Sequence, residues 1–264
     1  MKNPTEDGIE NLDEGATREY RGLVARANYM SLDRPDISFC VKELARKMSN
    51  PNVLDWQRLV RLARYLKGAP RFKIIYEYQA DFGFVAAVSD TDWAGCRRTR
   101  RSTSGGVLRH GSHVLRTWSK TQVVVALSSG EAELAGVVKG AGEALGIQSV
   151  ARDLGLEVAV RLHADSSAAI GICSRSGIGR IRHLAVGQLW VQEKIRDKTI
   201  SLHKCAGEHN PGDLFTKHLD RAKIEHHLSL ICARSEPGRV VSAPKLATEV
   251  QAFLAPIFVA SPRI

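Results

Sequence analysis

Four short acidic segments recur along this chain, and each places a carboxylate where a metal-dependent enzyme could use it. They span residues 89–93, 129–134, 163–167 and 210–214. Each acid follows an apolar, strand-like run or lies in the first turn of a helix-like one. One such acid is ordinary, because acids favour helix N-termini and turns. Four of them in a basic chain indicate a shared magnesium site, since hard divalent cations bind clustered oxygen ligands.

The positive charge of the chain is also clustered. The net charge is +10 and the densest basic run is 97–101, followed by Arg109, Arg116 and Lys120. Such fields favour phosphate backbones through counterion release. On charge alone a solvated surface is an equal alternative. The acidic segments favour nucleic acid, because magnesium and phosphate chemistry occur together.

Composition limits the class of protein. With 264 residues and 44% hydrophobic content, the chain can form one large domain or two small ones. It has neither the roughly 20-residue apolar run of a membrane helix nor the apolar stretch of a signal peptide. Five scattered cysteines without a CxxC pair argue against a disulfide framework or a zinc ribbon. These features predict a soluble, intracellular protein in the cytoplasm or nucleus, without a membrane partner.

The first part of the chain has a helical pattern. Residues 1–17 contain five acids against one lysine and predict a disordered acidic leader. From there to residue 69 apolar residues recur at helical spacing, with expected breaks at 33–35 and 50–52. This pattern predicts a helical subdomain over 18–69.

After residue 70 the pattern changes to that of an α/β domain over 72–230. Strands are expected at 84–89, 105–110, 112–118, 156–164 and 199–205. A long helix with Leu134, Val137 and Ala141 on one stripe follows the third strand. Shorter helices are expected at 166–173, up to about 196, and from Asn210, where Pro211 takes the first-turn position. This order predicts a five-stranded mixed sheet with flanking helices, followed by an irregular tail over 231–264.

The motifs together resemble the ribonuclease H domain of copia-type LTR retrotransposon Pol polyproteins. The matching segments are Ser-Asp-Thr-Asp-Trp-Ala-Gly at 89–95, Arg-Ser-Thr-Ser-Gly at 101–105, Ala-Leu-Ser-Ser-Gly-Glu-Ala-Glu at 126–133, Ala-Asp-Ser-Ser-Ala-Ala-Ile at 164–170, Arg-His-Leu at 182–184 and Asp-Leu-Phe-Thr-Lys at 213–217. Upstream, 20–24, 34–39 and 64–68 resemble the helices that end the reverse transcriptase of the same polyproteins, so 18–69 is interpreted as a remnant of that region. No Tyr-x-Asp-Asp polymerase signature is present.

The resemblance implies a ribonuclease H-like α/β fold and a magnesium-dependent endonuclease that hydrolyses the RNA strand of RNA–DNA hybrids. Two Mg²⁺ ions per site are expected, with Mn²⁺ as a substitute. They would activate water and stabilise the leaving oxygen. The expected partners are the hybrid and other parts of the Pol polyprotein, and virus-like particles are a further expected location. The alternative is a catalytically inactive relic that retains the fold and at most binds nucleic acid.

Within each acidic segment one residue is predicted as catalytic and metal-binding. Asp90 is preferred to Asp92, which is expected to cap the following turn. Glu133 is preferred to Glu131, because Ser128 and Glu131 have capping-box spacing.

The later two segments each contain one predicted ligand. Asp165 ends an apolar strand, and strand C-termini are where α/β sites assemble. Asp213 takes the fourth position on the resemblance, although helix capping by Asn210 and the helix dipole explain it without a metal.

The residues expected to contact nucleic acid are Arg97, Arg98, Arg100, Arg101 and Ser102, in a loop between the first two strands of the sheet. Trp93 is expected in the core rather than in a stacking surface.

Overall fold

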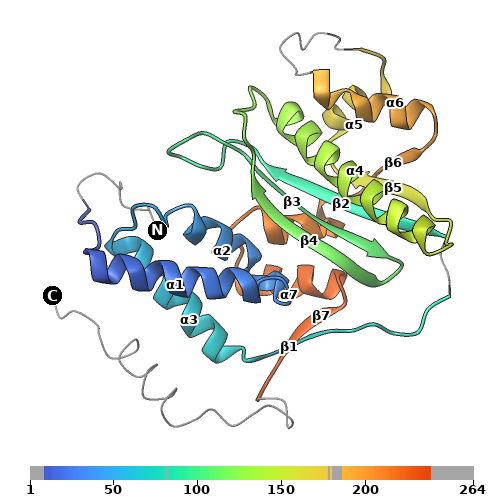
Figure 1. Cartoon of the computed structure of the whole chain (residues 1–264). Helices are drawn as coiled ribbons and strands as arrows, with labels where there is room; N and C mark the ends of the chain where they lie inside the picture. Colours follow the sequence, from blue (N-terminus) through green and yellow to red (C-terminus); the bar gives the residue numbers. More distant parts are fainter. Residues whose placement is uncertain (1–8, 81–82, 178, 180–185, 239–264) are drawn as a thin grey trace. The chain divides into compact units, whose positions relative to one another are not determined.

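The computed structural model describes residues 9–80, 83–177, 179 and 186–238 (Figure 1). The Arg-His-Leu motif at 182–184, residues 1–8 of the expected leader and residues 239–264 of the expected tail lie outside this part. The chain divides into two compact units. Of the described residues, those within Met1–Ser31, Cys40–Lys73 and Ser235–Ile264 form the first unit, and those within Leu32–Phe39 and Ile74–Arg234 form the second.

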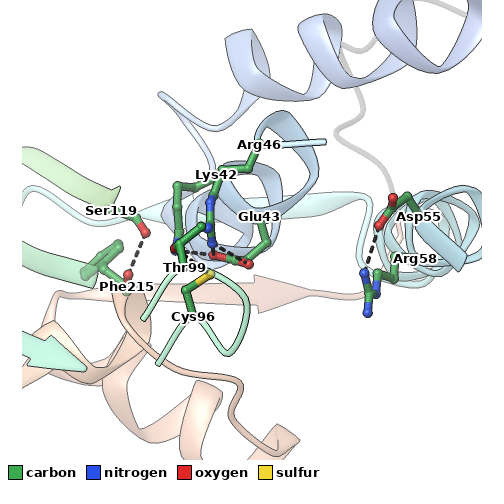
Figure 2. A network of polar contacts seen from close by, with 9 residues as sticks. All are labelled: Lys42, Glu43, Arg46, Asp55, Arg58, Cys96, Thr99, Ser119 and Phe215. Carbon is green, nitrogen blue, oxygen red and sulfur yellow. Dashed lines mark hydrogen bonds and ion pairs between the residues drawn. The ribbon is translucent and has the colours of Figure 1, made fainter. Parts of the chain in front are cut away.

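The first unit is built from helices. These are α1 (Glu14–Met30), most of α2 (Ser38–Ala45) and α3 (Val53–Gly68). The Tyr20 hydroxyl donates to the Leu44 carbonyl at 2.9 Å and so joins α1 to α2 inside the core. Asn52 and Asp55 form a capping box at the start of α3, and Asp55 also pairs with Arg58 at 2.8 Å (Figure 2). The helix breaks expected from Pro35 and Pro51 are observed.

Helix α1 corrects the expected extent of the acidic leader. It begins at Glu14, inside the segment 1–17. The physical reason is a helix cap: the Asp13 side chain accepts the N–H of Ala16 at 2.7 Å. Asp13 contributes to the acidic composition from which disorder is predicted, but in the structure it caps a helix.

A two-stranded sheet, which the sequence did not predict, pairs β1 (Arg71–Ile74) with β7 (Ala233–Glu236). Glu236 accepts ion pairs from Arg71 at 3.3 Å and Lys73 at 2.7 Å. The segment expected as an irregular tail from 231 therefore begins with a strand. Four residues lacking clear alternation give no strand signal, and their partner lies far away in sequence.

The second unit contains a five-stranded sheet in the order β4-β3-β2-β5-β6. Its strands are β2 (Phe84–Asp92), β3 (Thr103–His110), β4 (His113–Thr121), β5 (Ala159–Ala164) and β6 (Ile200–Lys204). β3 runs antiparallel to β2 and β4, whereas β5 runs parallel to β2 and β6. This confirms the expected α/β mixed sheet and places β2 at its centre.

Helix α4 (Ser129–Asp153) packs against β2, β3 and β5 and covers the sheet (Figure 1). Its stripe of Leu134, Val137 and Ala141 is buried in the main core, as expected. α5 (Ser167–Ser174) packs on α4 and on α6 (Trp190–Arg196), which follows the short turn η2 (Val186–Gln188).

The last helical segment differs from its prediction. Asn210 opens a short 3-10 helix, η4 (Pro211–Phe215), which follows η3 (Gly207–His209). η4 packs on β2 and β3, and a separate helix, α7 (Arg221–Leu230), starts at the cap Asp220. η4 ends at Phe215, and the hydroxyl of the next residue, Thr216, donates to Asp90, a buried acid of β2.

Residues Leu32–Phe39 group with the sheet rather than with the other helices. They contain the turn η1 (Pro35–Ile37) and a buried ion pair between Arg34 and Asp36 at 2.7 Å. The Phe39 ring meets His218, just after η4, edge-on with centroids 4.8 Å apart. A division of the chain at 69–72 alone therefore does not separate the two units.

Within the described residues, no helix is both long enough and apolar enough to cross a membrane.

Candidate active site

Two parallel strands bring the first pair of acids together. The paired residues of β2 and β5 end with Val88 beside His163. Asp90 and Asp165 each lie two residues beyond that pair, and neighbouring strands are about 4.8 Å apart. Asp90 is 3% exposed and Asp165 is half-buried. Parallel pairing therefore places two carboxylates side by side at one end of the sheet.

Helix α4 adds the third carboxylate from its first turns. One oxygen each of Asp90, Glu133 and Asp165 lie within 4.8 Å of one another. Glu131 has a different role: its carboxylate accepts the N–H of Leu127 at 2.9 Å and the hydroxyl of Ser128 at 3.2 Å. It therefore stabilises the start of α4, while Glu133 points to the acidic group.

Burial and mutual repulsion raise two pKa values in this group. For Glu133, burial first and then the charges of Asp90 and Asp165 raise the pKa to about 8. For Asp90, burial first and then the neighbouring Asp213 raise the pKa to about 7, against the opposing effects of Lys217 and the Thr216 hydroxyl. Without a cation, the folded protein favours the protonated carboxyls.

The segment 210–217 is fixed against β2 by close contacts. Asn210, fully buried, donates to the Ser89 carbonyl at 3.0 Å and accepts the N–H of Gly212 at 2.9 Å. The Ser119 hydroxyl donates to the Phe215 carbonyl at 2.6 Å, which ties β4 to η4 (Figure 2). A Cβ on Gly212 would lie 2.6 Å from the Asp90 Cβ, so only glycine permits this approach.

Asp213, the fourth predicted acid, lies beside the group of three without joining it. Its Oδ1 is 2.6 Å from the Lys217 Nζ, which is 3.8 Å from Asp90 Oδ2. Thr216 donates its hydroxyl to Asp90. Burial lowers the pKa of Lys217, but the charges of Asp90, Asp213 and Asp165 outweigh burial and raise it.

Sequence reasoning missed Thr216 and Lys217 as parts of the site. Both belong to the quoted motif 213–217, and the four-residue spacing of Asp213 and Lys217 is a signal for an ion pair on one helical face. Nothing local indicated that both would also reach Asp90. Asp92, in contrast, turns to its own loop, where its carboxylate occupies the space that a Cβ on Gly95 would need.

The arginine loop follows directly from the strand that contains Asp90. It lies between β2 and β3, as expected, and Arg97, Arg98, Arg100 and Arg101 are all exposed. Backbone hydrogen bonds between Cys96 and residues 100 and 101 close the loop. The Thr99 hydroxyl also donates to Cys96 Sγ at 3.0 Å (Figure 2).

Two expectations for this loop are corrected. Ser102 is fully buried and its hydroxyl accepts the N–H of Ala94 at 3.1 Å, so it holds the loop instead of facing a ligand. Trp93, expected in the core, is 46% exposed, with its indole N–H donated to the Ala126 carbonyl at 3.1 Å. The strand ends one residue before Trp93, which leaves the ring outside the sheet's packed face.

The acidic group fits a divalent cation on two observations. Oxygen ligands at about 2.0–2.6 Å from a cation lie within about 5 Å of one another, which the group satisfies. Glu133 Oε2 is also buried without a hydrogen-bond partner among the described residues. Such an oxygen is costly to leave unpaired, and a metal ligand bond would satisfy it.

Several proteins similar in sequence to this chain are retrovirus-related Pol polyproteins. No protein-family model matches it. The retrovirus-related Pol polyprotein from transposon RE1 of Arabidopsis thaliana is 30% identical over 216 residues, which are 81% of this chain and 15% of that protein. The chain is a homologue of retrotransposon Pol polyproteins. The resemblance found in the motifs is thereby confirmed. The polyprotein from transposon TNT 1-94 of Nicotiana tabacum is 27% identical over 82% of the chain and 16% of its own length.

The chain thus spans about one seventh of these Pol relatives. Among solved structures, the LC11-RNase H1 complex with an RNA/DNA hybrid is 11% identical to this chain. Its alignment covers 50% of this chain and 93% of that one, with a TM-score of 0.37.

The close approach at Gly212 gives a first prediction. In Gly212→Ala the new methyl would lie 2.6 Å from the Asp90 Cβ and 2.9 Å from its backbone N, so η4 must shift. Overpacking of this kind costs about 1–3 kcal/mol, measured as a loss in urea unfolding free energy. Gly142→Ala on α4 is the control, because a Cβ added at Gly142 would have no neighbouring residue's atom within 4 Å outside its own helical backbone. Equal stability of the two variants would contradict the described contact.

The raised pKa values predict an unusual pH dependence in EDTA. Glu133 titrates near 4.5 in the unfolded chain and near 8 when folded, so the native state binds more protons between these values. Stability should therefore fall as pH rises across that window. Glu133→Gln removes this titration and should raise Tm at pH 8 by about 2 °C or more, with a much smaller gain at pH 5. Glu157→Gln, at an exposed position, is the control. A gain that does not vary with pH would contradict the assignment.

Proposed function

We propose that this chain is the ribonuclease H part of a retrotransposon Pol polyprotein, a magnesium-dependent endonuclease acting on the RNA strand of RNA–DNA hybrids. One observation supports this above all: three carboxylates from β2, α4 and β5 have oxygens within 4.8 Å of one another, and one buried oxygen of Glu133 has no partner among the described residues. The homology to Pol polyproteins supplies the context in which such hybrids arise.

In this proposal Asp90, Glu133 and Asp165 hold the divalent cations, and Asp213 completes the ligand set. When bound, Mg²⁺ or Mn²⁺ would activate water and neutralise charge developing on the phosphate. Asp90 suits a central position, because its strand fixes the backbone and Thr216 holds one of its oxygens. Asn210 and Gly212 keep η4 within reach of that acid.

The exposed arginines are proposed to bind the hybrid next to the acids. Arg97 to Arg101 lie a few residues beyond Asp90 on a loop whose backbone is closed independently of their side chains. Exposed guanidinium groups attract phosphates without reading sequence. Trp93, exposed and held by Ala126, offers a ring face on the same loop.

The alternative is an inactive relic that keeps the fold. All four predicted acids are present and three are grouped, which favours an active site over this alternative. Cleavage of a labelled hybrid in Mg²⁺, compared with EDTA, separates the two.

The acidic group predicts the effect of a single amide substitution. Asp165→Asn keeps the side-chain shape and removes a metal-binding charge. The rate of hybrid cleavage in Mg²⁺ should therefore fall at least about 100-fold, which corresponds to an activation free energy about 2.7 kcal/mol higher. The apo fold should be retained or gain stability, because the carboxylates repel one another. Asp153→Asn, exposed at the end of α4, is the control. Cleavage within tenfold of the parent would remove Asp165 from the site.

The arginine loop predicts a change in salt dependence. Replacing Arg97, Arg98, Arg100 and Arg101 together by Gln should weaken hybrid binding for any sequence. The slope of log affinity against log salt should flatten by about 0.9 for each duplex phosphate that the loop no longer neutralises. A matched control replaces four exposed arginines of the helical unit, Arg18, Arg26, Arg61 and Arg64. If both variants change the slope equally, the loop has no specific part in binding.

A further inference from the structure

One positively charged side chain, Lys217, lies beside the acidic residues. Lys217 Nζ lies 2.6 Å from Asp213 Oδ1 and 3.8 Å from Asp90 Oδ2. Among the described residues, no other lysine or arginine forms an ion pair with any of the four predicted acids. The Lys217 side chain is 42% exposed, whereas that of Asp90 is 5% exposed. The ammonium therefore approaches the buried acids from the solvent side.

The position of this lysine is fixed by its neighbours. Its backbone N–H donates to the Asp213 carbonyl at 3.3 Å, and the preceding residue, Thr216, donates its hydroxyl to Asp90. The ammonium and the Thr216 hydroxyl thus approach the same oxygen of Asp90. Both contacts favour the charged form of Asp90 and offset part of the effect of burial on its pKa.

An ammonium in this position and a divalent cation on the same acids repel each other, because both are positive and the site is partly shielded from water. We propose that Lys217 is the built-in counter-ion of this site: it holds Asp213 and Asp90 together in the metal-free protein and competes with the divalent cation for Asp213. This inference rests on the proposed metal site, and it makes Lys217 a residue that lowers the affinity of that site for divalent cations. Lys217 is accordingly a positioning residue that acts through these acids.

The test measures metal binding directly, without the cleavage reaction. Mn²⁺ is titrated by calorimetry into the full chain, its Lys217→Met and Lys217→Arg variants, and the control Lys139→Met. Lys139 also pairs with an acid at four-residue spacing, Glu143, and is 36% exposed, so Lys139→Met controls for the loss of a half-exposed ion pair away from the acidic group. Lys217→Met should bind Mn²⁺ at least tenfold more tightly than the parent and unfold at a lower temperature in EDTA. Lys217→Arg and Lys139→Met should both stay within about threefold of the parent affinity.

A decrease in the Mn²⁺ affinity of Lys217→Met would identify a different role for the lysine. If Lys217 only shapes the backbone around Asp213, Lys217→Met should bind Mn²⁺ more weakly, and that result, or an unchanged affinity, overturns the proposal. A parent protein that binds no Mn²⁺ overturns the proposed metal site and this inference with it.

A second measurement uses the unmodified chain, in case Lys217→Met does not fold. In protein labelled with ¹⁵N-lysine, the Lys217 side-chain signal, assigned by its loss in Lys217→Arg, should shift as Mg²⁺ is added and saturate with Mg²⁺ binding. A signal that stays constant through saturation contradicts displacement of the ammonium from Asp213.

Discussion

Like charges confined to one end of a sheet set the main physical constraint on this fold. Asp90, Glu133 and Asp165 have oxygens within 4.8 Å of one another, and two of these acids are almost fully buried. Desolvation and repulsion both oppose ionisation, which is why the pKa of Glu133 reaches about 8 without a cation. The rest of the second unit must hold these side chains together despite that cost.

The scaffold does so with backbone positions rather than with flexible side chains. Parallel pairing of β2 and β5 fixes Asp90 beside Asp165, and the cap at Ser128 and Glu131 fixes the start of α4, from which Glu133 projects. On the other side of Asp90, η4 is held by Asn210 and by the absence of a side chain at Gly212. Rigid elements of this kind limit how far the acids can move apart.

Charge is separated along a single strand and its loop. β2 contains the buried Asp90 two residues before its end, and the residues after the strand form an exposed arginine loop held by contacts of Cys96, Thr99 and Ser102. Within the proposed function, the arginines would attract a phosphate backbone, and a divalent cation would offset the repulsion between that backbone and the acids. In the proposed function the basic loop would attract the polyanion and the acidic group would hold the metal.

The sequence by itself determined the α/β mixed sheet, the helices before residue 69 and which acid of each of the first two segments joins the acidic group. Periodicity and capping are local properties, so Ser128 with Glu131 and the apolar run before Asp165 could be interpreted without a structure. Only the tertiary structure decided how distant residues meet: the β1–β7 pairing, the burial of Ser102, and the grouping of Leu32–Phe39 with the sheet. The same holds for Lys217, because its pairing with Asp213 is local but its approach to Asp90 depends on how η4 packs against β2.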